Sequence, residues 1–354
     1  MKSLLKHLSP FAPDQSGAVS ALFEFGGLIV ICDAGGCTGN ICGFDEPRWF
    51  TRPGAVFSAG LRDMDAILGR DDKLVAKLQA AMQDSDLAFS AIVGTPVPAI
   101  IATDFLALKR MAEKRTGRPA ITVATTGTHH YDRGASAAWA ELFKTFATER
   151  LPVESGTVGV LGASPLDFSC VNAGTHLART LEHEGWRNVR CYGMGAGLDR
   201  VRTASAVKRN LVVSPAGLAA AKNLEKTFGT PYEVRCPWLR LPARTLDALP
   251  RIAGRNILVV HQQFAANAVR ERILSLHPEA RATVASWFMM EPDFMREGDF
   301  QIPGEEAFIE AVTGGGYDAI VCDERLRTAL PRPFRDIIVD FPHFAVSGRL
   351  IEED

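Results

Sequence analysis

The sequence lacks the features that would assign a chain to a membrane-spanning, nucleic-acid-binding or fibrous class. Its longest apolar runs, such as residues 26–32 and 99–102, fall far short of the roughly 20 residues that a spanning helix needs. The 39 Lys and Arg residues are balanced by 41 Asp and Glu residues, so no net field attracts nucleic acid or an anionic membrane. Low-complexity tracts and short repeats are also missing. We therefore expect a globular protein with no nucleic-acid or membrane partner.

The N-terminal segment is not expected to act as a secretion signal. Its short apolar stretch is interrupted by Lys6, His7 and Pro10, so the apolar region of about 7 to 15 residues that a signal peptide needs does not form. We therefore expect a cytoplasmic protein. In that reducing compartment the 7 cysteines are expected to be packing thiols or metal ligands rather than disulfides.

Short apolar runs alternate with amphipathic stretches along the chain, which predicts βαβ units and parallel sheets. Most of the runs are apolar throughout, as expected of strands that helices cover on both faces. The expected strands are residues 27–32, 88–93, 120–125, 157–161, 189–193, 211–214, 256–260, 282–286, 319–322 and 336–340. The expected helices include residues 61–68, 74–83, 105–115, 135–149, 172–184, 216–228 and 305–313. Several of them end at a glycine, namely Gly69, Gly117, Gly185 and Gly229.

Two Pro-containing segments, residues 150–156 and 249–255, each precede a new strand. They divide the chain into three units at residues 1–152, 153–253 and 254–354. The fold class expected from this pattern is α/β, with parallel sheets flanked by helices.

The most unusual segment places three thiols, Cys32, Cys37 and Cys42, within eleven residues of a glycine-rich turn. Because this turn follows a buried strand, Cys37 is expected at the carboxyl end of a parallel strand, where open α/β sheets bind ligands. The C-x4-C-x4-C spacing matches neither a zinc pair nor a ferredoxin run, so buried structural cysteines and cluster ligands both stay open. Glycines such as Gly36 and Gly39 favour the ligand interpretation, because they let backbone amides donate to cluster sulfides.

Longer segments of the sequence follow a known pattern. They are SPFAPDQSGAVSALFEFGGLIVICDAGGCTGNICGFDEPRW, FSAGLRDMDAILGRDDKL and GTPVPAIIATDFLALKRMAEKRTGRPAITVATTG in the first unit, and VGVLGASPLDFSCVNAGTHLARTLEHEGW and NLVVSPAGLAAAKNLEKTFGTPY in the second. These segments resemble the first two domains of the nitrogenase component 1 family, which includes the dark protochlorophyllide reductases, the chlorophyllide reductases and the nickel-sirohydrochlorin cyclases. The resemblance is most specific in residues 9–128 and weakest after about residue 250.

The resemblance implies three Rossmann-like domains, a dimer, and an iron-sulfur cluster near the subunit interface that an ATP-dependent iron protein reduces. Cys37 lies on the family's central cluster cysteine. The family's other two cluster positions fall near residues 9–11 and near Thr95, where this chain has no cysteine, so Cys32 and Cys42 are the candidate replacements. In a twofold homodimer, two thiols from each chain suffice for a [4Fe-4S] cluster, and three from each suffice for a larger cluster.

The resemblance also indicates which cofactors are not expected. The family's nitrogenase branch anchors its large cofactor on a cysteine where this chain has Ser214, so no iron-molybdenum type cofactor is expected. The loop of residues 193–197 lacks the lysine of a phosphate-binding loop, which leaves ATP to the partner protein.

Candidate substrate contacts lie in the loops that follow strands. They are residues 162–167, residues 193–197, Ser214, residues 261–263, and residues 126–131 with the His129–His130 pair. His129, His130 and His261 are candidate proton donors, because imidazole titrates near neutral pH. Asp45, Glu46 and Arg48 are interpreted as surface salt bridges.

We therefore expect an oxygen-sensitive, nitrogenase-like oxidoreductase component, for which an anaerobic setting is expected. It is a homodimer with an interface cluster, and it reduces an unsaturated small molecule, with a tetrapyrrole as one substrate class. Two alternatives stay open, a non-catalytic scaffold or carrier for metallocofactor assembly and a cluster-free small-molecule binding protein.

Overall fold

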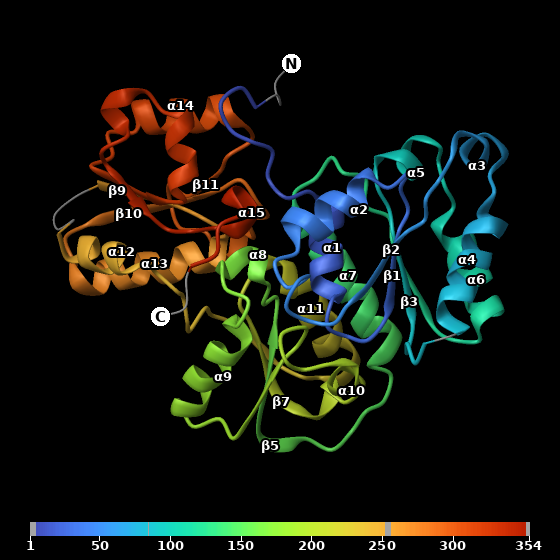
Figure 1. Ribbon diagram of the computed structural model, residues 1–354. Helices are drawn as coiled ribbons and strands as arrows, with labels where there is room; N and C mark the ends of the chain where they lie inside the picture. The colour runs from blue at the N-terminus through green and yellow to red at the C-terminus, as the bar shows by residue number, and fades with distance from the viewer. Residues whose placement is uncertain (1–4, 84, 252–255, 352–354) are drawn as a thin grey trace.

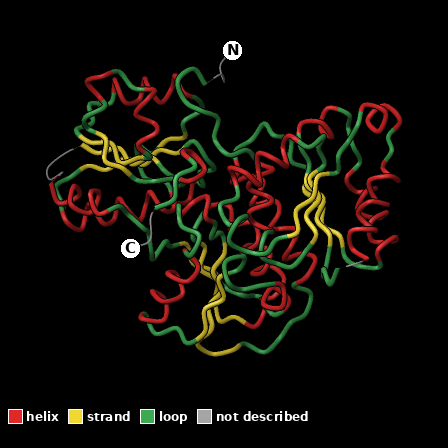
Figure 2. Tube along the Cα trace, in the orientation of Figure 1, coloured by secondary structure: helices red, strands yellow, loops and turns green. Residues whose placement is uncertain are grey.

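Three separate parallel sheets organise the chain (Figures 1 and 2). The structure is a computed structural model that describes residues 5–83, 85–251 and 256–351. The expected α/β fold with parallel sheets between helices is confirmed. The division expected between residues 253 and 254 lies outside the described residues, and the domain boundaries stay predictions.

The first sheet has the order β2-β1-β3-β4, with β1 (Leu28–Ile31) in its centre. Its other strands are β2 (Ala55–Ser58), β3 (Ser90–Val93) and β4 (Ala120–Val123). The helices α1 (Asp14–Leu22) and α7 (Tyr131–Phe146) cover one face. The other face is covered by α4 (Asp71–Gln83) and α6 (Phe105–Thr116), with the short helices α3 (Asp63–Leu68) and α5 (Pro96–Ile100) nearby (Figure 1). The fully buried residues of β1, β3 and most of β4 explain why these strands read as continuous apolar runs.

The second sheet has the order β6-β5-β7-β8 and the third has the order β11-β10-β9-β12-β13. The second unit comprises β5 (Glu154–Leu161), α8 (Pro165–Phe168), α9 (Ala173–His183), β6 (Asn188–Cys191), α10 (Leu198–Arg202), β7 (Val207–Val212), α11 (Leu218–Phe228) and β8 (Tyr232–Val234). The third comprises α12 (Ala243–Ala248), β9 (Asn256–Val260), α13 (Gln263–Leu276), β10 (Arg281–Ser286), β11 (Phe300–Gln301), α14 (Glu305–Gly314), β12 (Ala319–Cys322), β13 (Ile338–Asp340) and α15 (Phe344–Ser347).

All ten expected strands are present, with ends that differ by a few residues. The sequence did not predict β2, β8 and β11, which are short edge strands with partly exposed residues and therefore carry a weak apolar signal. The four glycines expected to end helices all have positive φ angles. Within the described ranges, no helix is both long enough and apolar enough to span a membrane.

Helix α1 was not among the expected helices, because it has no amphipathic stripe and is buried on every side. It packs closely against α7, since a Cβ atom on Gly17 would lie 1.8 Å from the Tyr131 carbonyl oxygen. A Cβ atom on Gly134 would lie equally close to the Asp14 carbonyl oxygen. The two glycines therefore set the approach of the two helices.

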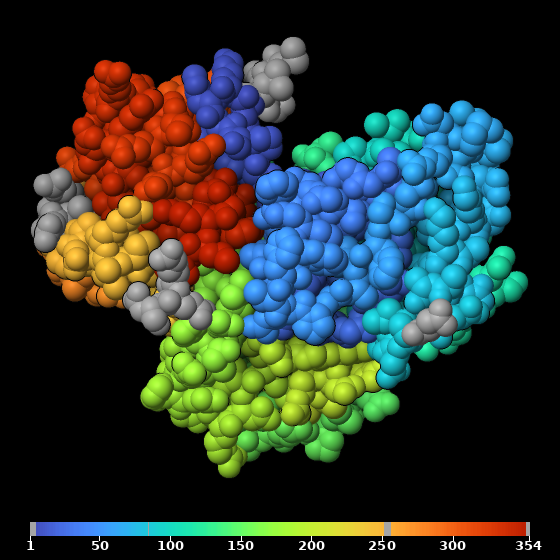
Figure 3. Space-filling view, in the orientation of Figure 1, coloured from blue at the N-terminus to red at the C-terminus, as the bar shows by residue number. Residues whose placement is uncertain are grey.

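The N-terminal segment crosses to the third unit, where it lies against the elements drawn in red (Figure 3). The backbone amides of Lys6, His7 and Leu8 donate to the Glu305 carboxylate at the start of α14. The Ala12 amide donates to the Ala345 carbonyl oxygen at 2.8 Å. The first and third units are thus joined by a segment that precedes both of their sheets.

Candidate functional site

The cysteine-bearing segment forms a helix directly after β1. It consists of α2 (Gly36–Asn40) and a π-helical turn, η1 (Ile41–Asp45). The buried Asp33 carboxylate fixes the start of this helix, because it accepts hydrogen bonds from the Thr38 amide (2.8 Å), the Thr38 hydroxyl (3.0 Å) and the Ser58 hydroxyl (2.6 Å). A carboxylate at a helix N-terminus satisfies free amides and interacts favourably with the helix dipole. Single π turns of this kind are frequent at functional sites.

Cys37 and Cys42 both lie on this helix, half-buried, against the core cluster that lies between the first sheet, α1 and α7. Burial, followed by the charge of Asp33, raises the pKa of the Cys37 thiol. Burial and then the charge of Glu46 raise the pKa of the Cys42 thiol. The two thiols are therefore protonated in the free chain at neutral pH, and a metal must displace their protons to bind them.

Thr95 stands next to Cys37, at the place where the sequence comparison expected the family's later cysteine. Its hydroxyl donates to the Cys32 carbonyl oxygen at 2.7 Å, and the same side chain acts on the Cys37 thiol by lowering its pKa, against the larger effect of burial. The Thr95 hydroxyl therefore lies at the position where the resemblance described above implies a cysteine.

Cys32 lies on the other face of the sheet. Along β1 the side chains alternate, so that Ile29 and Ile31 join the cluster under α1 and α7, while Val30 and Cys32 join the cluster under α4 and α6. The Cys32 side chain is 2% exposed, and burial raises the pKa of its thiol to about 12. It lines a cavity of about 260 Å³ together with residues of α3, α4 and the α5–α6 loop.

The structure thus brings Cys37 and Cys42 together on one helix and separates Cys32 from them. In the part of the chain that the structure describes, no three His, Cys, Asp or Glu side chains converge to form a metal site. A metal group on Cys37 and Cys42 therefore needs further ligands from outside the single chain.

Open space lies beside the glycines that neighbour the two half-buried thiols. Cβ atoms built on Gly36, Gly39 and Gly43 meet no other atom within 4 Å. Phe44 is 74% exposed and Phe50 is 79% exposed. Most of the exposed large apolar side chains in the described residues lie in the same unit, and the others there are Phe57, Met64, Ile67, Leu68, Ile100, Ile101 and Leu106. Contiguous apolar exposure marks an interaction surface, and Phe44 and Phe50, beside the cysteine helix, are the candidates for one here.

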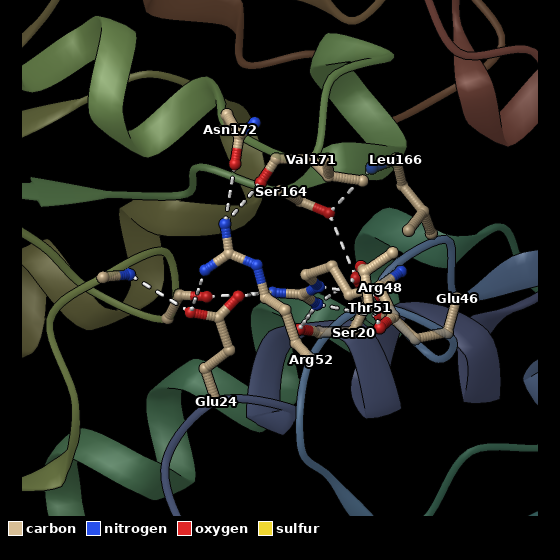
Figure 4. Close-up of polar contacts among 12 residues, drawn as sticks. Ser20, Glu24, Glu46, Arg48, Thr51, Arg52, Ser164, Leu166, Val171 and Asn172 are labelled. Carbon is tan, nitrogen blue, oxygen red and sulfur yellow. Dashed lines mark hydrogen bonds and ion pairs between the residues drawn. The ribbon is translucent and has the colours of Figure 1, made fainter.

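Immediately after the cysteine helix, Arg48 is the centre of a buried ion network (Figure 4). Its guanidinium donates to both carboxylate oxygens of Glu46 (2.7 and 2.8 Å), to Glu24 (3.1 Å) and to the carbonyl oxygen of Ser20 (2.7 Å). The Arg48 side chain is completely buried. The interpretation of Glu46 and Arg48 as a surface salt bridge was therefore wrong, because α1 and the second unit cover them.

The same network reaches the loops at the carboxyl end of the second sheet. Arg48 donates to the Gly193 carbonyl oxygen at 2.9 Å, and Arg52 donates to the Asn172 side-chain oxygen at 2.9 Å (Figure 4). Glu24 accepts from the Gly195 amide at 3.2 Å. The loop of residues 193–197 is thus fastened to the cysteine segment.

A second polar cluster lies where the three units meet. The Tyr131 hydroxyl, at the start of α7, donates to Asp167 Oδ1 of α8 at 2.5 Å and lies 2.9 Å from His343 Nε2, just before α15. His261 follows β9 and stacks on His343 with ring centroids 4.0 Å apart. Residues from all three units therefore form this junction cluster, which we define as Tyr131, Asp167, His261 and His343.

The histidines singled out from sequence occupy different surroundings. His261 is buried, and burial lowers its pKa to about 3, so it is neutral at physiological pH. His130 contacts the rings of Phe11 and Phe288, while His129 is exposed. The buried Ser214 hydroxyl donates to the Gly162 carbonyl oxygen at 2.7 Å.

Sequence reasoning named Tyr131 and Asp167 only as the ends of candidate loops, and it did not name His343. The sequence gives little indication of these residues, because each is a single polar residue beside the start of a helix. The three also lie far apart in the sequence. Only the packing of the three units brings them together.

Comparisons with known proteins agree with this architecture. The family model of nitrogenase component 1 type oxidoreductases matches residues 14–278. A solved structure of nitrogenase Cp1 at pH 6.5 has a TM-score of 0.73 at 12% identity and covers 96% of this chain and 87% of its own. A structure of nitrogenase Cp1 at pH 5 has a TM-score of 0.66 at 13% identity, with 91% and 81% covered. No curated protein sequence matches the chain.

Proposed function

Because the chain belongs to the nitrogenase component 1 type oxidoreductase family, we propose that it is an electron-accepting component with an iron-sulfur cluster between two copies of the chain. Electrons come from an ATP-dependent iron protein, and the substrate is an unsaturated small molecule. A cytoplasmic, anaerobic setting suits such an oxygen-sensitive group.

The observation that carries this proposal is the pair of half-buried thiols, Cys37 and Cys42, on one capped helix with open space beside them. One chain offers two thiols there, which is half of the four that a [4Fe-4S] cluster takes. A twofold axis beside the helix brings in the same two thiols from the second copy. Cys32 is the third candidate ligand for a larger cluster, but it must first leave the opposite face of the sheet.

The surroundings of the thiols fit such a group. Gly36 and Gly39 have no side chains to keep a cluster away from this helix. The Gly39 amide already donates to the Gly35 carbonyl oxygen at 3.1 Å, so the Gly36 amide, in the first turn of the helix, is the candidate donor to a cluster sulfide. The exposed Phe44 and Phe50 supply apolar contact area for a second protein chain around the site. When bound, the cluster supplies one-electron transfer at low potential.

The substrate site is assigned to the carboxyl-end loops of the second and third sheets, which the Arg48 network and the junction cluster tie to the first unit. Ser214 is buried and hydrogen-bonded to Gly162, and a serine hydroxyl does not replace a thiolate as an anchor for a metal cofactor. An iron-molybdenum type cofactor is therefore not part of this proposal. A tetrapyrrole is the substrate class to test first.

The experiment is anaerobic electron transfer from the iron protein. The purified dimer is mixed with a nitrogenase-type iron protein and either ATP or a non-hydrolysable analogue, and the reduced cluster is followed by EPR. We expect a signal with ATP only, and no signal in Cys37→Ser. A cluster that stays oxidised with every such reductase, although dithionite reduces it, contradicts the assigned role.

One observation favours a second candidate, a carrier for a metallocofactor. The rings of Tyr131, His261 and His343 fill the three-unit junction, with the two imidazoles stacked at 4.0 Å. A protein that only carries a cluster does not need a substrate-binding cavity where the three units meet. A carrier binds iron and gives it to an apo-acceptor without consuming ATP, whereas the oxidoreductase keeps its iron through repeated reduction.

A further inference from the structure

A cleft of about 380 Å³ lies between the second and third units. The segment that follows β8, residues 234–237, forms its wall on the second unit. On the third unit the wall is one face of α13, together with Phe294 of the short turn after β10. Helix α13 lies on the side of the third sheet that faces the second unit (Figure 1). The residues that line the cleft take no part in the Arg48 network or in the junction cluster.

The turn that carries Phe294 is fastened to α13 by two side-chain amides. Gln263 donates from Nε2 to the Glu291 carbonyl oxygen at 2.9 Å and accepts from the Glu291 amide at 2.8 Å. Asn267 donates from Nδ2 to the Phe294 carbonyl oxygen at 3.0 Å. The Phe294 ring packs against Phe264 with ring centroids 5.2 Å apart and planes at 71°. This wall is therefore formed before any ligand binds, as in most small-molecule sites.

The charged groups that line the cleft are already paired. The Arg235 guanidinium donates to both carboxylate oxygens of Glu184 (2.8 and 2.7 Å) and to Glu233 (3.1 Å). Glu271 accepts from Arg296. An ionic ligand has to displace one of these partners and lose its own hydration, so the cleft favours an uncharged molecule. For the same reason, it is not the site that we assign to a tetrapyrrole, whose carboxylates need free cations.

The interior of the cleft favours an aromatic ring. Two of the residues that line it are buried, Phe264 at 2% and Cys236 at 7% exposed, so the cleft reaches below the surface. Aromatic rings pack on the edges and faces of other rings, and sulfur also contacts ring edges favourably. Val234, Pro237 and Ala268 add apolar contact area. An apolar cavity of about 150 Å³ holds benzene, so this larger cleft has space for a bicyclic ring.

One polar side chain can orient such a ring. An Asn amide has two N–H groups and an oxygen with two lone pairs. Asn267 uses one N–H on the Phe294 carbonyl oxygen and one lone pair for the Arg270 guanidinium, which donates at 2.6 Å. Among the described residues, one N–H and one lone pair of Asn267 therefore remain for a hydroxyl or a ring N–H of a ligand.

We propose that this cleft binds a small, uncharged aromatic molecule that carries one hydroxyl or ring N–H. The molecule contacts a wall from each unit, so its binding stabilises the arrangement in which the second and third units lie together. The inference goes beyond the proposed function, because the cysteine helix takes no part in the cleft and binding needs no cluster.

Calorimetric titration of the purified protein with molecules that share one ring system tests this proposal. Indole is uncharged and has a ring N–H, and it should saturate one site per chain. 1-Methylindole should bind about fivefold more weakly, because it forfeits a hydrogen bond with Asn267. Indole-3-acetate and tryptamine carry charges of opposite sign, and each should bind about tenfold more weakly or worse, because the charge finds no partner. No saturation by indole, or equal affinity for all four molecules, overturns the proposal.

Three variants locate the site. Ala268→Phe fills the cleft from α13 and should weaken indole binding at least about tenfold. Ala137→Phe is the matched control, because it adds the same ring at an exposed position of α7, and it should bind indole as the wild type does. Phe294→Ala removes a half-buried wall ring from a surface turn and should also weaken binding, which covers the case in which Ala268→Phe does not fold.

Thermal unfolding gives an independent measurement. Saturating indole should raise the unfolding midpoint of the wild type and of Ala137→Phe, and it should leave that of Phe294→Ala unchanged. Wild-type affinity in both cleft variants overturns the inference, because the molecule then binds elsewhere. Binding to separated chains but not to the dimer also overturns it, because a second copy then covers the cleft. Iron-free protein that binds indole as expected overturns the proposed function alone.

Discussion

The cysteine helix and the junction cluster both contact α1, and they differ in almost every physical respect. Asp45 of the cysteine helix accepts from Ser16 of α1 at 2.6 Å, and the next residue of α1, Gly17, packs on the Tyr131 backbone. The cysteine helix is half-exposed, rich in glycine and flanked by exposed aromatic rings. The junction cluster is closed, ring-filled and hydrogen-bonded within one chain.

This difference teaches what each region needs in order to function. Under the proposed function, the two thiols on the open helix are half of a ligand set, and a second chain supplies the other half. The junction needs no second chain, because its three units already supply an acid, a phenol and two imidazoles. Substitutions in the cysteine helix should therefore change metal content and assembly. Substitutions in the junction cluster should change stability and proton binding.

The largest expected effect is loss of iron on changing the open thiols. Cys37→Ala and Cys42→Ala should each reduce iron and acid-labile sulfide from about four per dimer to near zero, because a [4Fe-4S] cluster that loses two symmetric ligands keeps only two. Cys191→Ala is the control, because Cys191 is a buried cysteine of the second unit. This variant should bind as much iron as the wild type. Cys32→Ala decides whether the third thiol is a ligand, and its place across the sheet predicts that iron is kept.

The second largest effect concerns Arg48, whose buried ion pairs anchor the cysteine helix. Arg48→Gln leaves the carboxylates of Glu46 and Glu24 without their buried cation, which should lower the free energy of unfolding by about 3 to 5 kcal/mol. Urea denaturation measures this loss. Arg202→Gln removes an exposed ion pair with Asp199 and should change stability by less than about 1 kcal/mol. Equal losses in the two variants would argue against a buried network.

A pair of glycine substitutions should have effects of opposite sign. Gly134→Ala forces a Cβ atom against the Asp14 carbonyl oxygen, so it should destabilise the α1–α7 contact by about 1 to 3 kcal/mol. Gly39→Ala meets no atom within 4 Å and improves a helical position by about 0.5 to 1 kcal/mol. Thermal unfolding of the iron-free protein compares them. Destabilisation by Gly39→Ala would mean that the helix is not open as described.

The most gradual effect is a pH dependence of stability, because it is spread over the pH range between the unfolded and folded pKa values of Asp167. The folded pKa of Asp167, about 8, lies above its unfolded value of 3.8, so the folded state holds the extra proton. Its contribution is fully present below about pH 4 and is lost as the pH rises through about 8, with a slope of about 1.4 kcal/mol per pH unit. For His261 the sign is reversed, because burial lowers its pKa to about 3, and stability therefore rises between about pH 3 and 6.5.

Urea unfolding of wild type and Asp167→Asn across this range isolates the contribution of the acid. The difference in unfolding free energy between the two proteins should change steadily between pH 5 and 8 and level off above it. A difference that does not change with pH would mean that Asp167 is ionised in the folded protein.

The sequence predicted local features well. Apolar runs predicted the buried strands, and the glycines that end helices have the expected left-handed backbone. The alternation of Leu28, Val30 and Cys32 in the sequence also contains the information that Cys32 faces away from Ile31 and the cysteine helix. That signal was available and was not used.

Features that depend on packing between distant segments were not predictable in this way. The sequence around Arg48 is typical of a surface charge. The side chain is buried only because α1 and the loop at Gly193 pack over it. The junction cluster needs three units to meet before Tyr131 finds Asp167 and His343. Helix α1 is buried on all sides and therefore has no amphipathic pattern, so hydrophobic periodicity in the sequence does not predict it.

The central claim is that two copies of the chain share one cluster through Cys37 and Cys42. Native mass spectrometry of anaerobically purified protein tests it most directly, because iron and chain number are read from the same ion. The account predicts a species of two chains with about four irons and four sulfides, and its absence in Cys37→Ala. Iron on single chains, or a dimer that holds no iron, would contradict it.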